Sequence, residues 1–168
     1  MNTDFVAPLF LTYAMLTVVP VIPELVTSPP VIINETGSMQ KGLYARTGDA
    51  FDPKYGDIIA MPMGQSAQQY LREKLGYPAK TLLVKRVAAL PGEKICRAEN
   101  VVILPDRTVP VMKHDNKGNI LPSWAGCYTL SPNEVFILGD HPSSFDSRYF
   151  GAVQIEDLVG TYREVLSW

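Results

Sequence analysis

The most extended apolar stretch of the chain lies near its amino terminus. No charged residue occurs from Phe5 to Pro23, and these 19 positions are mostly apolar. As a helix they would span roughly 28 Å at about 1.5 Å per residue, close to the ~30 Å hydrocarbon core of a bilayer. A cleaved signal usually has a basic start and an A-x-A site, and the run shows neither. We expect residues 1–29 to form an uncleaved hydrophobic anchor and stalk; a removed signal and a core helix are the alternatives.

The remaining residues, 30–168, alternate between short apolar runs and turn residues. Strands are expected at 31–34, 57–61, 81–90, 101–104, 108–112, 134–140 and 157–168. One segment, 66–75, has a helical pattern, with Ser66 as its N-cap and Gly76 after its last turn. This pattern predicts a single all-β domain with one short helix.

Composition excludes several classes of function. The chain has 168 residues, a length typical of one domain, and its 15 basic and 17 acidic residues give a net charge of −2. That balance provides no basic surface for nucleic acid. Two cysteines and two histidines, without C-x-x-C spacing, give little material for a zinc site. We therefore expect no nucleic-acid partner, no metal and no cofactor.

Lys85 is the most informative single residue of the apolar runs. It lies inside TLLVKRVAAL (81–90), where alternation places Leu83 and Val87 on its own face of the strand. A lysine held among aliphatic side chains has its charged form disfavoured, so its pKa falls, and it can act as a general base. The alternative is an edge-strand lysine whose ammonium group reaches water.

Two polar segments could supply further groups to a site. Ser38 follows Gly37 directly after an expected strand, where small residues let a substrate backbone approach. The segment 139–151 places several hydroxyl and charged side chains behind another strand. Taken alone, the first is an ordinary turn serine, and the second is a polar loop with an Asp146–Arg148 ion pair.

Together these segments resemble the type I signal peptidase family. The matching boxes, in order, are Gly37-Ser38-Met39, Gly56-Asp57-Ile58-Ile59, Lys85-Arg86-Val87 with Leu90-Pro91-Gly92-Glu93, and Gly139-Asp140 with Ser144-Phe145-Asp146-Ser147-Arg148-Tyr149-Phe150-Gly151. Within the family the chain looks most like the TraF-like conjugative transfer peptidases, through Asn34-x-Thr36-x-Ser38 followed by Lys41-Gly42-Leu43-Tyr44. The resemblance implies a mostly antiparallel β fold of the signal-peptidase and LexA-like kind. One departure is His141-Pro142, where many signal peptidases have asparagine and a longer loop.

The resemblance also implies a serine–lysine dyad. Ser38 would be the nucleophile and neutral Lys85 its general base. Thr36 would lend its hydroxyl to an oxyanion hole beside the Ser38 backbone N–H. Ser144 would orient Lys85 through a hydrogen bond, and Asp146 and Arg148 would support the loop. A catalytic histidine, either His114 or His141, is the competing base.

A substrate of this family lies extended along the strands beside the dyad. The positions that match the pocket for the residue before the cut are apolar, which favours a small side chain there; they are Met39, Leu43, Leu83 and Val84. The implied function is a membrane-tethered serine endopeptidase that matures exported proteins, in particular a conjugative pilin, by cleavage and possible cyclisation. The alternatives are a general type I signal peptidase, a LexA-like self-cleaving regulator, which the anchor disfavours, and a non-catalytic pilus-assembly scaffold.

The anchor and the family also imply a location and a cross-link. The catalytic domain would face the periplasm from the inner membrane, or be periplasmic if the amino-terminal segment is removed. A small insertion is expected at about 93–130. Cys96 and Cys127 flank most of it, and outside the cytoplasm they would form a disulfide. Two buried free thiols are the alternative.

Overall fold

The computed structural model describes residues 28–168. The predicted anchor and stalk, residues 1–29, therefore lie outside the described residues except at their last two positions. Within the described range, no helix is both long enough and apolar enough to cross a bilayer.

The main sheet contains seven strands in the order β1-β2-β11-β3-β4-β9-β10, and every pair in it is antiparallel. Its strands are β1 (Val31–Asn34), β2 (Gly42–Gly48), β3 (Ile58–Pro62), β4 (Leu82–Ala89), β9 (Glu134–Leu138), β10 (Val153–Gln154) and β11 (Gly160–Ser167). β4 is an interior strand between β3 and β9. This position buries six of its eight residues, which accounts for its nearly continuous apolar sequence.

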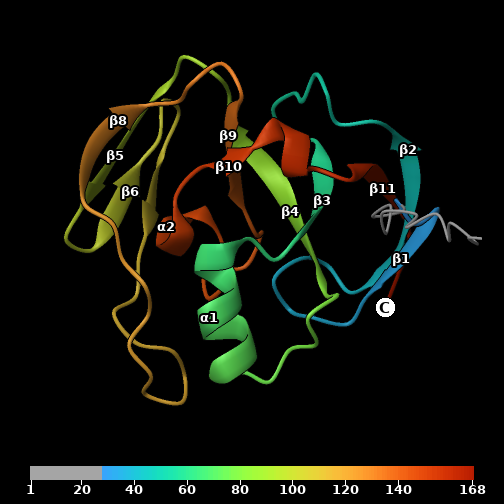
Figure 1. Cartoon of the computed structure of the whole chain (residues 1–168), viewed down its shortest axis with the longest axis horizontal. Helices are drawn as coiled ribbons and strands as arrows, with labels where there is room; N and C mark the ends of the chain where they lie inside the picture. The colour runs from blue at the N-terminus through green and yellow to red at the C-terminus, as the bar shows by residue number, and fades with distance from the viewer. Residues whose placement is uncertain (1–27) are drawn as a thin grey trace, which may run out of the picture.

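A second antiparallel sheet has the strand order β7-β6-β5-β8. It comprises β5 (Lys94–Ala98), β6 (Val101–Ile103), β7 (Thr108–Pro110) and β8 (Gly126–Thr129). All its residues lie within the range 93–130. The expectation that this range is an insertion relative to the family stays a prediction. In Figure 1 this sheet lies on one side of the molecule and β1, β2 and β11 on the other.

The predicted disulfide is present between Cys96 and Cys127. These residues lie directly opposite each other in the register of β5 and β8. The alternative of two free thiols is therefore wrong for this structure. The bond links the neighbouring strands β5 and β8 of the second sheet.

In residues 28–168, three helices accompany the sheets: α1 (Gln65–Glu73), α2 (Ser147–Phe150) and the 3-10 helix η1 (Ile155–Asp157). α1 is the predicted helix, but it begins earlier than expected, with Gly64 as its N-cap. The prediction of Ser66 as N-cap was wrong because the extended backbone that precedes the helix already ends at Gly64.

The fold is mostly antiparallel β with few helices, as the sequence predicted. Apolar side chains from both sheets and from α1 form the larger core cluster, which includes Ile59, Leu71, Val87, Ile95 and Phe136. A smaller cluster of Met39, Tyr44, Ala60, Val84 and Tyr162 lies near the start of β2. The two clusters enclose β4 between them, so the residues of this strand are held firmly in position.

Candidate active site

The turn after β1 is organised by the buried side chain of Asn34. Its Oδ1 accepts hydrogen bonds from the Thr36 backbone N–H (3.3 Å) and from Thr36 Oγ1 (2.8 Å). Its Nδ2 donates to the carbonyl oxygens of Thr36 (3.0 Å), Met39 (3.2 Å) and Gln40 (2.9 Å). An asparagine at the end of a strand commonly forms such local bonds. Five bonds to one side chain fix the backbone on both sides of Ser38.

Lys85 approaches Ser38 from the interior strand β4. Its Nζ lies 2.9 Å from Ser38 Oγ and 3.2 Å from the Val84 carbonyl oxygen. The lysine is 3% exposed. The alternative of an edge-strand lysine that reaches water is therefore wrong. The structure brings together the two residues that the sequence motifs single out, although they are 47 positions apart.

Burial is the main cause of an altered protonation equilibrium at Lys85. Burial lowers the lysine pKa most strongly, Asp146 and Asp140 raise it, and the Arg148 guanidinium lowers it; the resulting pKa is about 8. At pH 7 a pKa of about 8 leaves roughly a tenth of the molecules with a neutral amine, against about 0.03% for an ordinary lysine. A neutral Nζ has a lone pair that can accept the proton of Ser38.

The hydroxyl of Thr36 lies 3.2 Å from that of Ser38. Because Thr36 donates its own proton to Asn34, it accepts the Ser38 proton when Lys85 is charged. When Lys85 is neutral, Ser38 can turn its proton toward Nζ instead. The expected role of Thr36 as an oxyanion donor requires it to release Asn34 first.

A buried ion pair holds the loop after β9. Asp146 and Arg148 are 0% and 3% exposed, and their Oδ2 and Nη2 atoms lie 2.7 Å apart. Asp146 also accepts from the Gly139 N–H (2.8 Å). The Arg148 guanidinium donates to the carbonyl oxygens of His141, Pro142 and Ser144. Both residues thus fix the loop and do not contact the Ser38 or Lys85 side chain through any hydrogen bond of the described residues.

The loop fits closely against the Ser38 turn at Gly139. The His141 N–H donates to the Ser38 carbonyl oxygen (3.2 Å). A Cβ at Gly139 would lie 2.1 Å from Ser144 Oγ and 2.7 Å from the Ser38 carbonyl oxygen, so only glycine fits here.

Ser144 is buried, and its Oγ has no hydrogen-bond partner among the described residues. The predicted hydrogen bond to Lys85 is therefore not formed in this structure. The Ser144 side chain lies against Gly139 instead, and Lys85 Nζ donates to Ser38 and Val84.

A cavity of about 460 Å³ opens over the Ser38–Lys85 pair. Of the residues predicted to contact the substrate, Leu83 and Val84 line it. Met39 and Leu43 do not. Met39 is buried against Val84 in the smaller core cluster, and Leu43 on β2 is paired with β1 and β11.

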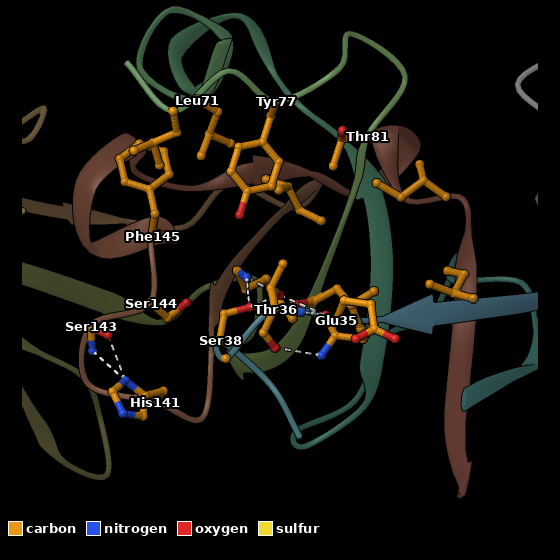
Figure 2. A pocket seen from close by; sticks show the side chains of 18 of the residues that line it. Glu35, Thr36, Ser38, Leu71, Tyr77, Thr81, His141, Ser143, Ser144 and Phe145 are labelled. Atoms are coloured by element: carbon orange, nitrogen blue, oxygen red, sulfur yellow. Dashed lines mark hydrogen bonds between the residues drawn. The ribbon is translucent and has the colours of Figure 1, made fainter. Parts of the chain in front are cut away.

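Neither histidine contacts Ser38 through its side chain. His114 forms an isolated bridge with Ile120 and does not line the cavity. His141 lines the cavity, but its Nδ1 is bonded to Ser143 Oγ at 2.7 Å. Figure 2 shows the His141 ring beside Ser143 and away from Ser38. Among Lys85, His114 and His141, only Lys85 has a side chain that forms a hydrogen bond with Ser38 Oγ.

Comparison with known proteins agrees with these motifs. The model of the family "Signal peptidase, peptidase S26" matches residues 6–168. The chain belongs to the signal peptidase family. Membership confirms the resemblance found in the four boxes.

Individual relatives include proteins of conjugation. The chain is 34% identical over 101 residues to the conjugal transfer protein TraF of Agrobacterium fabrum, covering 59% of this chain and 57% of that protein. It is 28% identical over 151 residues to a plasmid transfer protein TraF of Escherichia coli, covering 81% and 82%. The chain thus spans little more than half of the first relative.

Signal peptidases without a conjugation name are also similar. Signal peptidase I of Bacillus caldolyticus is 33% identical over 89 residues, 46% of this chain and 49% of that protein. A crystal structure of signal peptidase I from Enterococcus faecalis V583 aligns at 25% identity over 66% of this chain and 96% of that one, with a TM-score of 0.41.

Proposed function

We propose that this protein is a serine endopeptidase in which Ser38 is the nucleophile and Lys85 the general base. The observation that carries the proposal is the 2.9 Å contact between Ser38 Oγ and an Nζ atom that is buried and has a lowered pKa. A nucleophile and a base within hydrogen-bond reach, with the base held by a third group, is the usual arrangement for acyl transfer. The Val84 carbonyl is that third group here.

The first chemical step follows from this geometry. Neutral Lys85 takes the Ser38 proton as Oγ attacks the scissile carbonyl carbon. The negative charge that develops on the carbonyl oxygen is stabilised by the Ser38 backbone N–H, with Thr36 as the second donor once it releases Asn34. One such donor contributes about 3 kcal/mol to the transition state. The C–N bond then breaks, Lys85 passes its proton to the leaving amine, and an ester on Ser38 remains.

The substrate backbone would pair with the free edge of β4. The pairing of β9 with β4 starts at Arg86, which lies opposite Leu138, so β9 leaves residues 82–85 uncovered on that side. An extended peptide can add to such an edge through main-chain hydrogen bonds. Leu83 and Val84, which line the cavity, would then contact the residue before the cut.

The substrate class is an exported protein, and a conjugative pilin is the specific candidate. Two relatives carry conjugal or plasmid transfer in their names, which favours the pilin. The relative named signal peptidase I keeps general removal of signal peptides as the second candidate. In both, the chain would be tethered to the inner membrane by its amino-terminal segment, with the catalytic domain in the periplasm. The disulfide agrees with an oxidising compartment.

The ester on Ser38 could be resolved by an amine as well as by water. An acyl-enzyme keeps the carboxyl group of the peptide activated. The amino terminus of the same chain has a high effective concentration, so it competes when the site excludes water. Aminolysis by that amino terminus would close the peptide into a ring.

Co-expression with candidate pilins, followed by intact mass measurement, tests the proposal. We expect a shortened product with the full-length wild-type chain and unprocessed substrate with Ser38→Ala. A ring would be about 18 Da lighter than the linear product, because one water is not added. Processing that persists in Ser38→Ala would overturn the assignment. If both proteins are folded and neither cleaves any candidate substrate, the result would instead support a non-catalytic role as a pilus-assembly scaffold.

A further inference from the structure

The short helix α2 holds the loop that contacts Ser38. Its N-cap, Asp146, accepts a hydrogen bond from the Arg148 N–H, and the ion pair between these two residues fixes the loop after β9. That loop in turn donates the His141 N–H to the Ser38 carbonyl oxygen. A helix of four residues is too short to be stable in isolation, so the position of α2 depends on the contacts that it makes with the rest of the fold.

The second sheet and the segment that leads into β8 make three side-chain hydrogen bonds to the backbone at α2. Arg97 Nη1 donates to the Arg148 carbonyl oxygen, and Trp124 Nε1 donates to the Ser147 carbonyl oxygen at 3.1 Å. The Tyr128 hydroxyl oxygen accepts a bond of 3.1 Å from the second backbone N–H after the helix. The last carbonyl groups of a helix lack partners within it, so donors from outside complete them. The side chains of Arg97, Trp124 and Tyr128 are called the clamp below; in Figure 1, α2 lies beside the second sheet.

The members of the clamp contact one another as well as α2. The guanidinium carbon of Arg97 lies 5.9 Å from the centre of the Trp124 ring and 6.0 Å from that of Tyr149. The Trp124 ring meets the Tyr128 ring edge-on, with centroids 5.2 Å apart. Cation–π and edge-to-face contacts favour one arrangement of the side chains. A shift of one member of the clamp is therefore expected to move the others.

The disulfide lies next to the clamp on both strands. Arg97 follows Cys96 on β5, and Tyr128 follows Cys127 on β8. β8 is an edge strand of four residues, and its neighbour in the second sheet is β5. A pair of short strands is only marginally stable by itself. The S–S bond therefore fixes the two sides of the clamp relative to each other.

Reagents in solution can reach this bond, because Cys127 is exposed. A dithiol reduces it in a balanced exchange: the S–S bond breaks, and each of the two cysteines gains one electron and one proton to become a thiol. The dithiol loses both electrons and both protons and becomes a cyclic disulfide. Afterwards β8 is held to β5 by strand pairing without a covalent link.

We propose that the disulfide sets the catalytic geometry through the clamp, whose members are positioning residues, so that the peptidase has full activity only while the bond is intact. With the bond broken, the clamp releases α2, and the loop after β9 loses its fixed contact with the Ser38 turn. Full activity would then require an oxidising compartment, which the domain reaches after export. The inference rests on the proposed function, because it concerns the regulation of the Ser38–Lys85 pair.

Kinetics of the full-length wild type with and without dithiothreitol test the inference, on the substrate that the oxidised protein cleaves. We expect reduction to lower kcat by about ten- to a hundredfold, the usual effect of a misplaced catalytic group, and to leave KM within about twofold. The double variant Cys96→Ser/Cys127→Ser should have the low kcat of the reduced protein and should not respond to dithiothreitol.

The pH of half-maximal activity should also rise on reduction. Burial is the main cause of the lowered Lys85 pKa, and a displaced loop admits water to Nζ. The charged groups that act on Lys85 all lie between the end of β9 and the end of α2; they are Asp140, Asp146 and Arg148. A change confined to the overall stability of the fold would leave this pH where it is.

Conservative variants of the clamp test its members one at a time. Trp124→Phe removes the indole N–H and Tyr128→Phe removes the hydroxyl group, and each keeps an aromatic ring. We expect either variant to lower kcat about two- to tenfold, the usual effect of one neutral hydrogen bond, with KM unchanged. Tyr162→Phe is the matched control, because that hydroxyl donates to the Pro29 carbonyl oxygen, and its kcat should equal that of the wild type. Clamp variants with the kcat of this control would overturn the positioning role.

Amide hydrogen exchange of the full-length protein separates this inference from the proposed function, because it needs no cleavage. Reduction should speed exchange at residues 139–152 about tenfold or more, while β3 and β4 stay protected. Faster exchange confined to that segment supports the clamp even if the wild type cleaves nothing and the proposed function fails. If kcat and exchange are unchanged on reduction, or if exchange rises equally throughout the protein, the inference is overturned. The proposed function then stands wherever the oxidised protein cleaves.

Discussion

Lys85 is a buried cation, and the free energy that it costs the fold can be measured. Its pKa of about 8, against 10.5 for an ordinary lysine, corresponds to about 3 kcal/mol of differential destabilisation of the charged form. The folded pKa is lowered, so between pH 8 and 10.5 the unfolded chain binds more protons than the folded one. Stability therefore rises with pH across this window, and the full penalty is present below pH 8.

The substitution Lys85→Met removes the charge at nearly the same side-chain length. We expect it to stabilise the folded protein by about 2 to 3 kcal/mol at pH 7, since Ser38 loses one partner but keeps Thr36. For a domain of this size the gain corresponds to a rise in Tm of roughly 4–12 °C. The gain should shrink above pH 8 and nearly vanish at pH 10.5. Peptidase activity should be lost at every pH.

Denaturant unfolding of both proteins from pH 6 to 10.5 provides the measurement. Taking the difference in the free energy of unfolding between wild type and variant removes the contribution of groups that titrate in both proteins. Lys94→Met, at an exposed position of β5, is the matched control and should change stability by less than about 0.5 kcal/mol. A Lys85→Met protein that is no more stable than wild type at pH 7, or a gain independent of pH, would refute the account of Lys85 as a destabilised cation.

Three further predictions concern the same site and its supports. First, kcat/KM should rise about tenfold per pH unit below pH 8 and level off above it, because Lys85 must lose its proton; a flat profile from pH 6 to 9 would contradict this role. Second, Asp146→Asn should lower the free energy of unfolding by about 3–5 kcal/mol, because the Arg148 charge is left buried without its partner; a loss below about 1 kcal/mol, measured by urea denaturation, would show that the pair is dispensable. Third, alkylation without reductant should leave Cys96 and Cys127 unmodified in periplasmic protein, and replacing both by serine should cost about 3.5–4 kcal/mol; two alkylated thiols would argue against the bond.

The hydrophobic pattern of the sequence predicted most clearly the strands that lie in the interior of the main sheet. β4 and β9 are interior strands, so their apolar runs are long and visible in the sequence. β2 was missed because only its first half is apolar, and its exposed second half reads as a turn. β5 and β8 were missed for a related reason: they belong to the small second sheet, where few positions are buried and polar residues alternate irregularly.

The motifs located Ser38 and Lys85 better than the groups around them. Ser38 and Lys85 lie in contact as predicted, but the five bonds that Asn34 makes to the turn carrying Ser38 were not predicted. An asparagine at a strand end next to a Thr-x-Ser sequence is a signal that could have indicated it. The Arg86–Asp140 pair, with two contacts of 2.9 Å, joins residues 54 positions apart and needs the fold to be seen. Met39 was expected at the substrate pocket but lies in the smaller core cluster, because an apolar residue beside Ser38 can face the core as readily as the cleft.

The close approach of the Ser38 turn and the loop after β9 gives a last prediction, at Gly139. Its backbone φ is not positive, so the need for glycine here is one of space and not of backbone conformation. A Cβ would lie within 2.7 Å of two atoms of Ser144 and of the Ser38 carbonyl oxygen. The loop that carries Ser144 is held by the Asp146–Arg148 pair, and the turn that carries Ser38 is held by Asn34, so neither can move away freely. Gly139→Ala should therefore destabilise the protein by about 1–3 kcal/mol.

The same substitution should also separate Ser38 from the loop and break the bond from the His141 N–H to the Ser38 carbonyl oxygen. We expect kcat to fall in Gly139→Ala by more than its loss of stability explains at temperatures where it stays folded. Gly37→Ala is the control for stability, because a Cβ at Gly37 meets no atom within 4 Å, and its free energy of unfolding should stay the same or rise slightly. Equal stability of the two alanine variants would show that the loops can separate without cost, and the proposed rigid contact between them would then be wrong.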